Sequence, residues 1–266
     1  LDANLRDVRR AEASQTSETV IDRLRLDAGR VEAMAEGLRK LIHLPDPAGK
    51  IVESWTRPNG LQIQKVQVPL GVVAIIYENR PNVTSDAFGL CLKSGNVAFL
   101  RGSSAAIDSN IAIARALREG IAKAGLPEDC LVLVTDTSHR TAIEFMQLRD
   151  HIDCLIPRGG PSLINSILEN ATVPYVIDGD GNCHVYVDID ADLALAESVV
   201  VNAKMQRPSV CNAAESLVVH ADIAAEFLPR IAGALAGVEL VGDKRASGLV
   251  SAIALAGDHD WSTEYL

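Results

Sequence analysis

From residue 66 onward, short apolar runs alternate with longer segments that have helical periodicity. The apolar runs at 71–76, 97–100, 130–134, 152–156 and 173–177 predict buried strands. The segments between them predict a loop at 78–82, a helix that ends near residue 93, and helices at 105–124, 139–148 and 161–170. Strands that alternate with helices are typical of a parallel sheet with helices on both faces. The pattern therefore predicts an α/β fold.

Two other patterns precede this alternation. Within residues 2–42, apolar side chains recur every three or four positions, which predicts helices that end before Pro45 and Pro47. The segment 51–63 predicts two strands joined by a turn, because Pro58, Asn59 and Gly60 follow one another in its middle. We expect a helical N-terminal region followed by a hairpin.

A second α/β unit follows the first along the chain. Its pattern predicts a strand at 184–187, a helix at 192–201, a strand at 216–219, a helix at 222–236 and a short strand at 238–241. Asp178-Gly179-Asp180-Gly181 interrupts the pattern between the two units. We therefore expect two domains, at 1–178 and 179–266.

Polar loops follow three of the strands predicted in the first domain. They are 77–82, 101–104 and 158–160, and ligands of parallel sheets bind at the carboxyl ends of strands. Gly159 and Gly160 would let a phosphate approach the backbone ahead of a helix that begins at Pro161, although adjacent glycines are also common in plain turns. Ser103 or Ser104 could simply cap the next helix.

Cys211 lies in an unusual place for a core cysteine. It follows the helix predicted at 192–201, beyond Pro208, which stops a helix, and it precedes a strand, so it should lie on a connection. Lys204 and Arg207 supply nearby positive charge that favours the nucleophilic thiolate. The alternative is a small buried hydrophobic residue. From the residues alone, the two interpretations are about equally supported.

The bulk composition narrows the class of partner. The chain has 266 residues, 48% of them apolar, and a net charge of −10, which argues against nucleic acid or an anionic membrane as the main partner. An anionic substrate would need a local basic pocket, for which the candidates are Arg80, Arg101, Arg158, Lys204 and Arg207. Five cysteines without paired spacing favour a reducing compartment, hence the cytoplasm, and no metal site.

The segment 202–212, which contains Cys211, resembles the nucleophile segment of the gamma-glutamyl phosphate reductase family, within the aldehyde dehydrogenase superfamily. Further similar segments occur in the same order at 55–60, 69–73, 77–83, 93–96, 156–160 and 181–188. The resemblance covers almost the whole chain. It implies an aldehyde dehydrogenase-like fold with a cofactor-binding domain at 1–178 and an incomplete catalytic domain at 179–266. The chain begins at Leu1 and stops at Leu266 within a pattern, so we expect a fragment.

The resemblance also assigns roles to residues. It implies that Cys211 is the nucleophile and that Asn82 helps to hold the substrate oxyanion, with Asn79 and Arg80 as alternatives. Arg80, Lys204 and Arg207 are the expected substrate-binding residues. The residues expected to bind NADP(H) are Arg101, Gly102, Ser103, Arg158, Gly159, Gly160 and Glu264. A solvated surface position is nearly as good an interpretation of Glu264.

The implied reaction is the NADPH-dependent reduction of L-glutamyl 5-phosphate to L-glutamate 5-semialdehyde and phosphate through a cysteine thioester, in proline biosynthesis. Hydrolytic members of the superfamily carry a water-activating glutamate where this chain has Asp178 and Asp180. The alternatives are an acylating or hydrolytic aldehyde dehydrogenase and a non-catalytic cofactor-binding fragment. Glutamate 5-kinase is an expected partner, and the formation of a homo-oligomer stays open.

Overall fold

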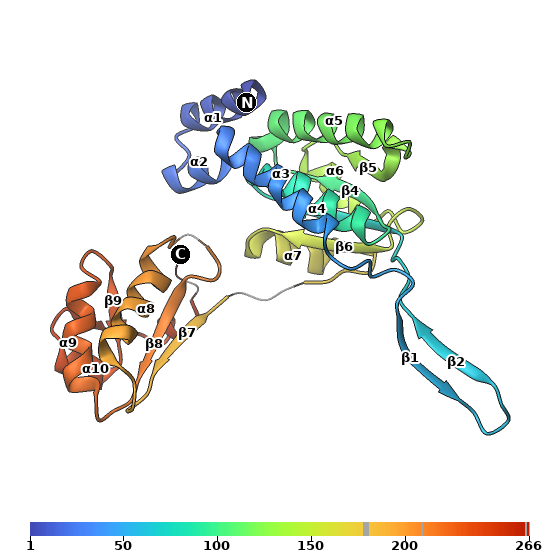
Figure 1. Cartoon of the computed structure of the whole chain (residues 1–266). Coiled ribbons are helices and arrows are strands. Elements are labelled where there is room, and N and C mark those ends of the chain that lie inside the picture. Colours follow the sequence, from blue (N-terminus) through green and yellow to red (C-terminus); the bar gives the residue numbers. More distant parts are fainter. Residues whose placement is uncertain (178–180, 209, 264, 266) are drawn as a thin grey trace. The chain divides into compact units, whose positions relative to one another are not determined.

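The computed structural model describes residues 1–177, 181–208, 210–263 and 265 (Figure 1). The chain divides into two compact units, Leu1–Ile177 and Asp178–Leu266. Each unit has a hydrophobic core of its own.

A parallel sheet forms the centre of the first unit. Its strands are β3 (Val72–Tyr77), β4 (Val97–Arg101), β5 (Leu131–Leu133) and β6 (Cys154–Arg158), in the spatial order β5-β4-β3-β6. All three neighbouring pairs are parallel, in agreement with the α/β fold that the alternating pattern predicts. The side chains of β3 are almost all buried, because helices cover both faces of a sheet of this kind.

The side chains of β3 alternate between two cores. Val73 and Ile75 pack with α4 (Asn82–Lys93) and α5 (Ile107–Lys123), whose contributions include Phe88 and Ile121. Ala74 and Ile76 face the opposite way and pack with α6 (His139–Phe145) and α7 (Pro161–Asn170). This two-residue period places helices on both faces of the sheet. Two 3-10 turns, η1 (Ser104–Ala106) and η2 (Glu128–Cys130), complete the connections.

The N-terminal region is helical, as its apolar spacing predicts. It consists of α1 (Asp2–Ala13), α2 (Glu18–Leu24) and α3 (Ala28–Ile42). The small core that α1 and α2 share also receives Ala106, which lies just before α5. The first helices are therefore anchored beside the connection that follows β4.

The predicted hairpin is also present. Its strands are β1 (Ile51–Thr56) and β2 (Gln62–Val66), which pair antiparallel and extend away from the rest of the first unit (Figure 1). Gly60 closes the turn with a φ of +86°, a conformation that glycine adopts at little cost. Nearly every residue of both strands is exposed.

The second unit contains two small parallel sheets. Strands β7 (Cys183–Val187) and β8 (Ala214–Val219) form one, and β9 (Leu240–Gly242) and β10 (Ile253–Leu255) form the other. The helices are α8 (Leu193–Met205), α9 (Ala224–Ala234) and α10 (Lys244–Leu249), and the 3-10 turn η3 spans Asp260–Ser262. Val187, Val200 and Phe227 belong to the core that joins these elements.

Some predicted boundaries need correction. The helix predicted at 192–201 continues to Met205, because the residue that stops it is Pro208. The strand predicted at 173–177 is reduced to one bridge between Tyr175 and Leu155, since Pro174 offers a carbonyl oxygen and has no N–H for a ladder. The pattern also missed α10 and β10.

Candidate active site and cofactor loops

The sheet order of the first unit points to one edge as a candidate ligand site. The chain passes from β3 through α4 to β4 on one side of β3, whereas β6 pairs with β3 on the other side. Ligands of doubly wound sheets bind beyond the carboxyl ends of strands, where the strand order reverses in this way. The loops after β3 and β6 meet at that position.

Glu78 joins these two loops. Its backbone N–H donates to the carbonyl oxygen of Arg158 at 3.1 Å, and its carboxylate accepts from the N–H of Gly160 at 3.2 Å. A Cβ atom on Gly159 would lie 2.7 Å from the Glu78 carboxyl carbon and 2.8 Å from Leu163 Cδ2. Glycine is therefore required at 159 if the Glu78 bridge is to keep this geometry.

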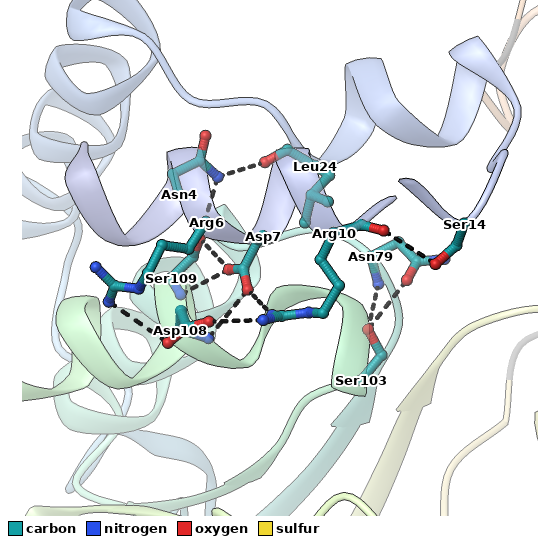
Figure 2. Close-up of polar contacts among 10 residues, drawn as sticks. All are labelled: Asn4, Arg6, Asp7, Arg10, Ser14, Leu24, Asn79, Ser103, Asp108 and Ser109. Atoms are coloured by element: carbon teal, nitrogen blue, oxygen red, sulfur yellow. Dashed lines mark hydrogen bonds and ion pairs between the residues drawn. The ribbon is translucent and has the colours of Figure 1, made fainter. Parts of the chain in front are cut away.

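Asn79 joins the loop after β3 to the loop after β4. Its φ of +35° is left-handed, a region that asparagine enters more readily than most residues. The hydroxyl of Ser103 donates to Asn79 Oδ1 at 3.0 Å and accepts from the Asn79 N–H at 3.3 Å (Figure 2). Ser103 precedes η1, but its side chain makes no capping hydrogen bond there. Its hydroxyl thus connects two loops of the candidate site.

Gly102 sits on a buried polar network. Thr84 Oγ1 lies 2.7 Å from the Tyr77 hydroxyl and donates to Asn110 Oδ1 at 3.1 Å. A Cβ atom on Gly102 would come within 2.1 Å of Asn110 Nδ2 and 3.2 Å of Tyr77 Cζ. Burial raises the pKa of Tyr77 to about 12, so its hydroxyl stays protonated and the network stays neutral. The backbone of the loop lies directly against this network.

Arg101 is buried beside the same loop, with 8% of its surface exposed. Its Nη2 donates to the carbonyl oxygens of Thr137 at 2.9 Å and Ser138 at 2.8 Å. Burial lowers the pKa of Arg101, and the Asp136 carboxylate opposes this shift. The Nε atom is buried without a hydrogen-bond partner in the part of the chain that the structure describes. The guanidinium thus has an unpartnered buried donor at Nε, while Nη2 holds the connection before α6.

Other predicted residues of the first unit occupy the same edge. Asn82 is the first residue of α4, and its side-chain amide donates to Asp86 Oδ2 at 2.9 Å. Arg158 is the last, exposed residue of β6 and pairs in register with Tyr77. Arg80 is half-buried on the loop between β3 and α4. The side-chain amide of Asn82 is thus engaged within its own helix in this conformation.

Sequence reasoning missed one set of contacts, which joins α1 to the start of α5. Asp7 is fully buried, accepts from the N–H and hydroxyl of Ser109 at 2.8 and 2.6 Å, and pairs with Arg10 (Figure 2). Asp7 also accepts from the N–H of Asp108 at 3.3 Å. A carboxylate at this position satisfies backbone donors of the first turn of α5. The alternation of apolar residues contains no signal for a pair so far apart in sequence.

The Cys211 segment belongs to the second unit. Cys211 is exposed and lies on the connection between α8 and β8, as predicted. The backbone turns through hydrogen bonds from Val210 N–H to Arg207 O at 3.4 Å and from Ala213 N–H to Val210 O at 3.0 Å. The Cys183 thiol donates to the carbonyl oxygen of Cys211 at 3.4 Å. The reactive group predicted from sequence is therefore accessible, and a second thiol lies beside its backbone.

The predicted cations of this unit are placed differently. Lys204 lies in the last turn of α8, and its ammonium donates to the carbonyl oxygen of Tyr265 at 3.5 Å. Arg207 is exposed just beyond the helix. Glu264, Asp178 and Asp180 lie outside the described residues, so their predicted roles are untested.

Two other cysteines contrast with Cys211. Cys91 and Cys154 are buried in the cores of the first unit. Burial raises the pKa of Cys91 to about 11 and also raises the pKa of Cys154. A thiol that stays protonated is a poor nucleophile, so these two side chains have a packing role.

Within residues 1–177, 181–208, 210–263 and 265, the structure has no cluster of three or more histidine, cysteine, aspartate or glutamate residues suited to a metal ion. In the same ranges, every helix is too short or too polar to cross a lipid bilayer.

Comparison with known proteins gives a consistent picture. The sequence model of the aldehyde dehydrogenase family matches residues 3–256. The chain is 53% identical over 265 residues to gamma-glutamyl phosphate reductase of Clostridium botulinum, covering 99% of this chain and 64% of that protein. The enzyme of the same name from Heliobacterium modesticaldum is 52% identical over 268 residues, covering 100% and 64%.

A solved structure agrees with these relatives. The crystal structure of gamma-glutamyl phosphate reductase from Thermotoga maritima matches with a TM-score of 0.92 at 44% identity, covering all of this chain and 64% of that one. The chain therefore spans 64% of the length of each of these relatives.

Proposed function

This chain belongs to the aldehyde dehydrogenase family, and from that premise we propose that it carries the nucleophile and cofactor loops of an NADPH-dependent reductase. The substrate is L-glutamyl 5-phosphate, and the products are L-glutamate 5-semialdehyde, a proline precursor, and phosphate. The observation that carries this proposal is 53% identity, over 99% of the chain, to a protein named gamma-glutamyl phosphate reductase.

Cys211 is the nucleophile in this proposal. Its sulfur attacks the acyl carbon, a C–S bond forms, the bond to the phosphate oxygen breaks, and inorganic phosphate leaves. The resulting thioester divides one difficult displacement into two easier steps. The exposure of Cys211 on a connection after α8 supports this role, because the substrate must reach the thiol. After reduction of the thioester, the C–S bond breaks, which releases the aldehyde and restores the Cys211 thiolate.

The cofactor is NADP(H), which supplies the hydride for the reduction when bound. The residues of the carboxyl edge fit such a group on two observations. Arg101 Nε is a buried donor without a described partner. A Cβ built on the N-cap residue Gly160 would meet no atom within 4 Å outside its chain neighbours, while the Glu78 carboxylate accepts from the Gly160 N–H at 3.2 Å. The start of α7 at Gly160 has no side-chain cap, which suits a phosphate. The same loops also contain Gly102, Ser103, Arg158 and Gly159. Glu264 is the last residue of the proposed NADP(H)-binding set.

Positive side chains receive the anionic substrate. Lys204 and Arg207 precede Cys211 within the same segment, and Arg80 lies in the loop after β3. Such charges are needed because the chain as a whole has a net charge of −10, which repels anions at long range. Asn82 is proposed to donate to the developing oxyanion, where one fixed donor is typically worth about 3 kcal/mol. Its amide would have to leave Asp86 to do so.

The test is the reverse reaction, measured as NADP reduction by L-glutamate 5-semialdehyde with and without phosphate. We expect turnover that requires phosphate in the unsubstituted protein, and a loss on the order of a thousandfold or more in Cys211→Ala. Cys130→Ala is the matched control, because this half-buried thiol lies in the first unit and should be dispensable for turnover.

The alternatives make different predictions in the same assay. Turnover that is indifferent to phosphate would identify a hydrolytic aldehyde dehydrogenase, and a requirement for coenzyme A would identify an acylating one. A folded protein that binds NADP without turnover would identify a non-catalytic cofactor-binding fragment. Retention of activity in Cys211→Ala would refute the cysteine mechanism.

A further inference from the structure

Two cysteines of the second unit lie side by side although 28 residues separate them in sequence. Cys183 is the first residue of β7, and Cys211 is three residues before the start of β8. These two strands pair in parallel, with Cys183 opposite Ala214 and an irregularity in the register just after it. The sheet therefore brings the Cys183 thiol to the Cys211 segment, where it donates to the Cys211 carbonyl oxygen at 3.4 Å.

The distance limits how far the two sulfur atoms must move to meet. A carbonyl oxygen lies about 2.4 Å from the Cα atom of its own residue, so the Cys183 sulfur is at most about 6 Å from Cys211 Cα. A disulfide therefore requires the Cys183 sulfur to approach Cys211 Cα by roughly 2 Å at most, and the Cys211 side chain to turn toward it about χ1. Both residues are accessible, Cys211 being exposed and Cys183 half-buried.

The other three cysteines differ from this pair in location, and two of them also differ in exposure. Cys91, Cys130 and Cys154 lie in the first unit, and Cys91 and Cys154 are buried in its cores. Oxidation requires thiolate character and access, which burial denies to Cys91 and Cys154. An oxidant that enters the second unit therefore meets Cys211 with Cys183 as its neighbour.

We propose that Cys183 is a resolving thiol that forms a reversible disulfide with Cys211 when the protein meets a hydroperoxide. The Cys211 thiol loses its proton, its sulfur attacks one peroxide oxygen, and the O–O bond breaks. The leaving alkoxide or hydroxide takes up that proton as an alcohol or water, and Cys211 becomes a sulfenic acid. The Cys183 sulfur then attacks the Cys211 sulfur, an S–S bond forms, the S–O bond breaks, and water leaves with the thiol proton. Two thiols supply the two electrons that reduce the peroxide.

The disulfide has a chemical consequence for Cys211. A sulfenic acid without a partner is oxidised further to sulfinic and sulfonic acids, and the sulfonic form is irreversible. A disulfide stops this progression, and a dithiol restores both cysteines. This site goes beyond the proposed reductase function, because it requires only the two thiols and an oxidant.

The test is peptide mapping of the purified protein after limited treatment with hydrogen peroxide. Free thiols are alkylated in denaturant before digestion, and the peptides are identified by mass spectrometry. We expect a linked peptide that contains Cys183 and Cys211 and disappears after dithiothreitol. In Cys183→Ser we expect no such link, and the fraction of Cys211 that dithiothreitol recovers should fall at least about fivefold.

Cys130→Ser is the matched control and should form the linked peptide as the unsubstituted protein does. If Cys211 of the unsubstituted protein oxidises without any link to Cys183, the proposal is wrong, whether or not the Cys183→Ser variant folds. Equal recovery of Cys211 in Cys183→Ser would overturn it as well. Because no substrate is used, a failure of the reductase proposal leaves this result unaffected.

Discussion

At the carboxyl edge of the first unit, side chains fix the loops after β3, β4 and β6, whereas backbone turns hold the Cys211 segment of the second unit. Glu78 and Ser103 each join two loops of the edge, and Gly102 lies against a buried polar network. Around Cys211, the described contacts are two turn hydrogen bonds and the Cys183 thiol. Side-chain contacts fix the loops of one region, whereas the other region leaves the Cys211 side chain exposed.

The two regions should therefore respond differently to substitution. A fixed loop orients a ligand without further ordering cost, but it depends on the packing beneath it. An exposed thiol depends little on packing and much on what reaches it. We therefore expect substitutions at the edge to act through the stability of the first unit and substitutions at Cys211 to act through chemistry.

The sharpest test of this contrast is Asp7→Ala. The substitution leaves the buried N–H of Ser109 without its carboxylate partner, and Arg10 loses its buried partner as well. We expect the free energy of unfolding of the first unit to fall by about 3 kcal/mol, measured by urea denaturation. The rate at which iodoacetamide alkylates Cys211 should stay unchanged.

Asp2→Ala is the matched control for this experiment, because Asp2 lies exposed in the first turn of the same helix. Its expected effect is within about 0.5 kcal/mol. Similar small effects of both substitutions would show that α1 does not support the edge. A slower alkylation of Cys211 in Asp7→Ala would show that the two regions are coupled.

A second, smaller effect on stability should distinguish alanine substitutions at two glycines, Gly102 before α5 and Gly120 within it. Gly102→Ala would place a methyl group 2.1 Å from Asn110 Nδ2, whose residue is fully buried, so we expect a loss of about 2 kcal/mol. Gly120→Ala adds a methyl group to open space within α5 and should stabilise the protein by up to about 1 kcal/mol. Thermal unfolding of both variants checks the opposite signs. If Gly102→Ala leaves the thermal stability unchanged, the side chains of the buried polar network can move at little cost.

The smallest expected effect concerns alkaline pH and the buried thiol of Cys91. Its pKa rises from an ordinary 9.0 to about 11 in the folded protein, so the unfolded chain loses this proton first. The stabilisation is complete below pH 9.0 and is lost as the pH rises toward 11, by about 1.4 kcal/mol per pH unit. Urea denaturation between pH 8 and 10 should therefore show a decline that is smaller by about 1.4 kcal/mol for Cys91→Ala than for Cys130→Ala. Parallel declines would contradict the assignment.

Much of this architecture can be predicted from the sequence, because its signals are local. The alternation of apolar runs and amphipathic segments predicts the sheet and its helices, and Pro58, Asn59 and Gly60 predict the hairpin turn. The short elements α10, with 6 residues, and β10, with 3, fall below the length at which periodicity is informative. They depend on packing in the second unit.

Some features of the candidate site can also be predicted from the sequence, and others cannot. The three loops and the exposed connection of Cys211 follow from strand ends and Pro208. The contacts that organise them do not, because the Asp7–Ser109 and Glu78–Gly160 bonds span 102 and 82 residues. The sequence also predicts that Arg101 and Lys204 contribute to a basic pocket. In the structure, the guanidinium of Arg101 and the ammonium of Lys204 each donate to a backbone carbonyl oxygen. Where a long side chain points is decided by its neighbours in space.

The sheet order β5-β4-β3-β6 also sets the sequence of events by which the first unit can assemble. The Asn79–Ser103 contact spans 24 residues and needs only β3, α4 and β4, which leave the ribosome together. The Glu78–Gly160 bond spans 82 residues and must wait for β6, and its longer loop adds about 1 kcal/mol to the entropy of closure. Pulse-labelled hydrogen exchange should find amides of β4 protected before those of β6. The loop after β6 is thus the last part of this edge to form.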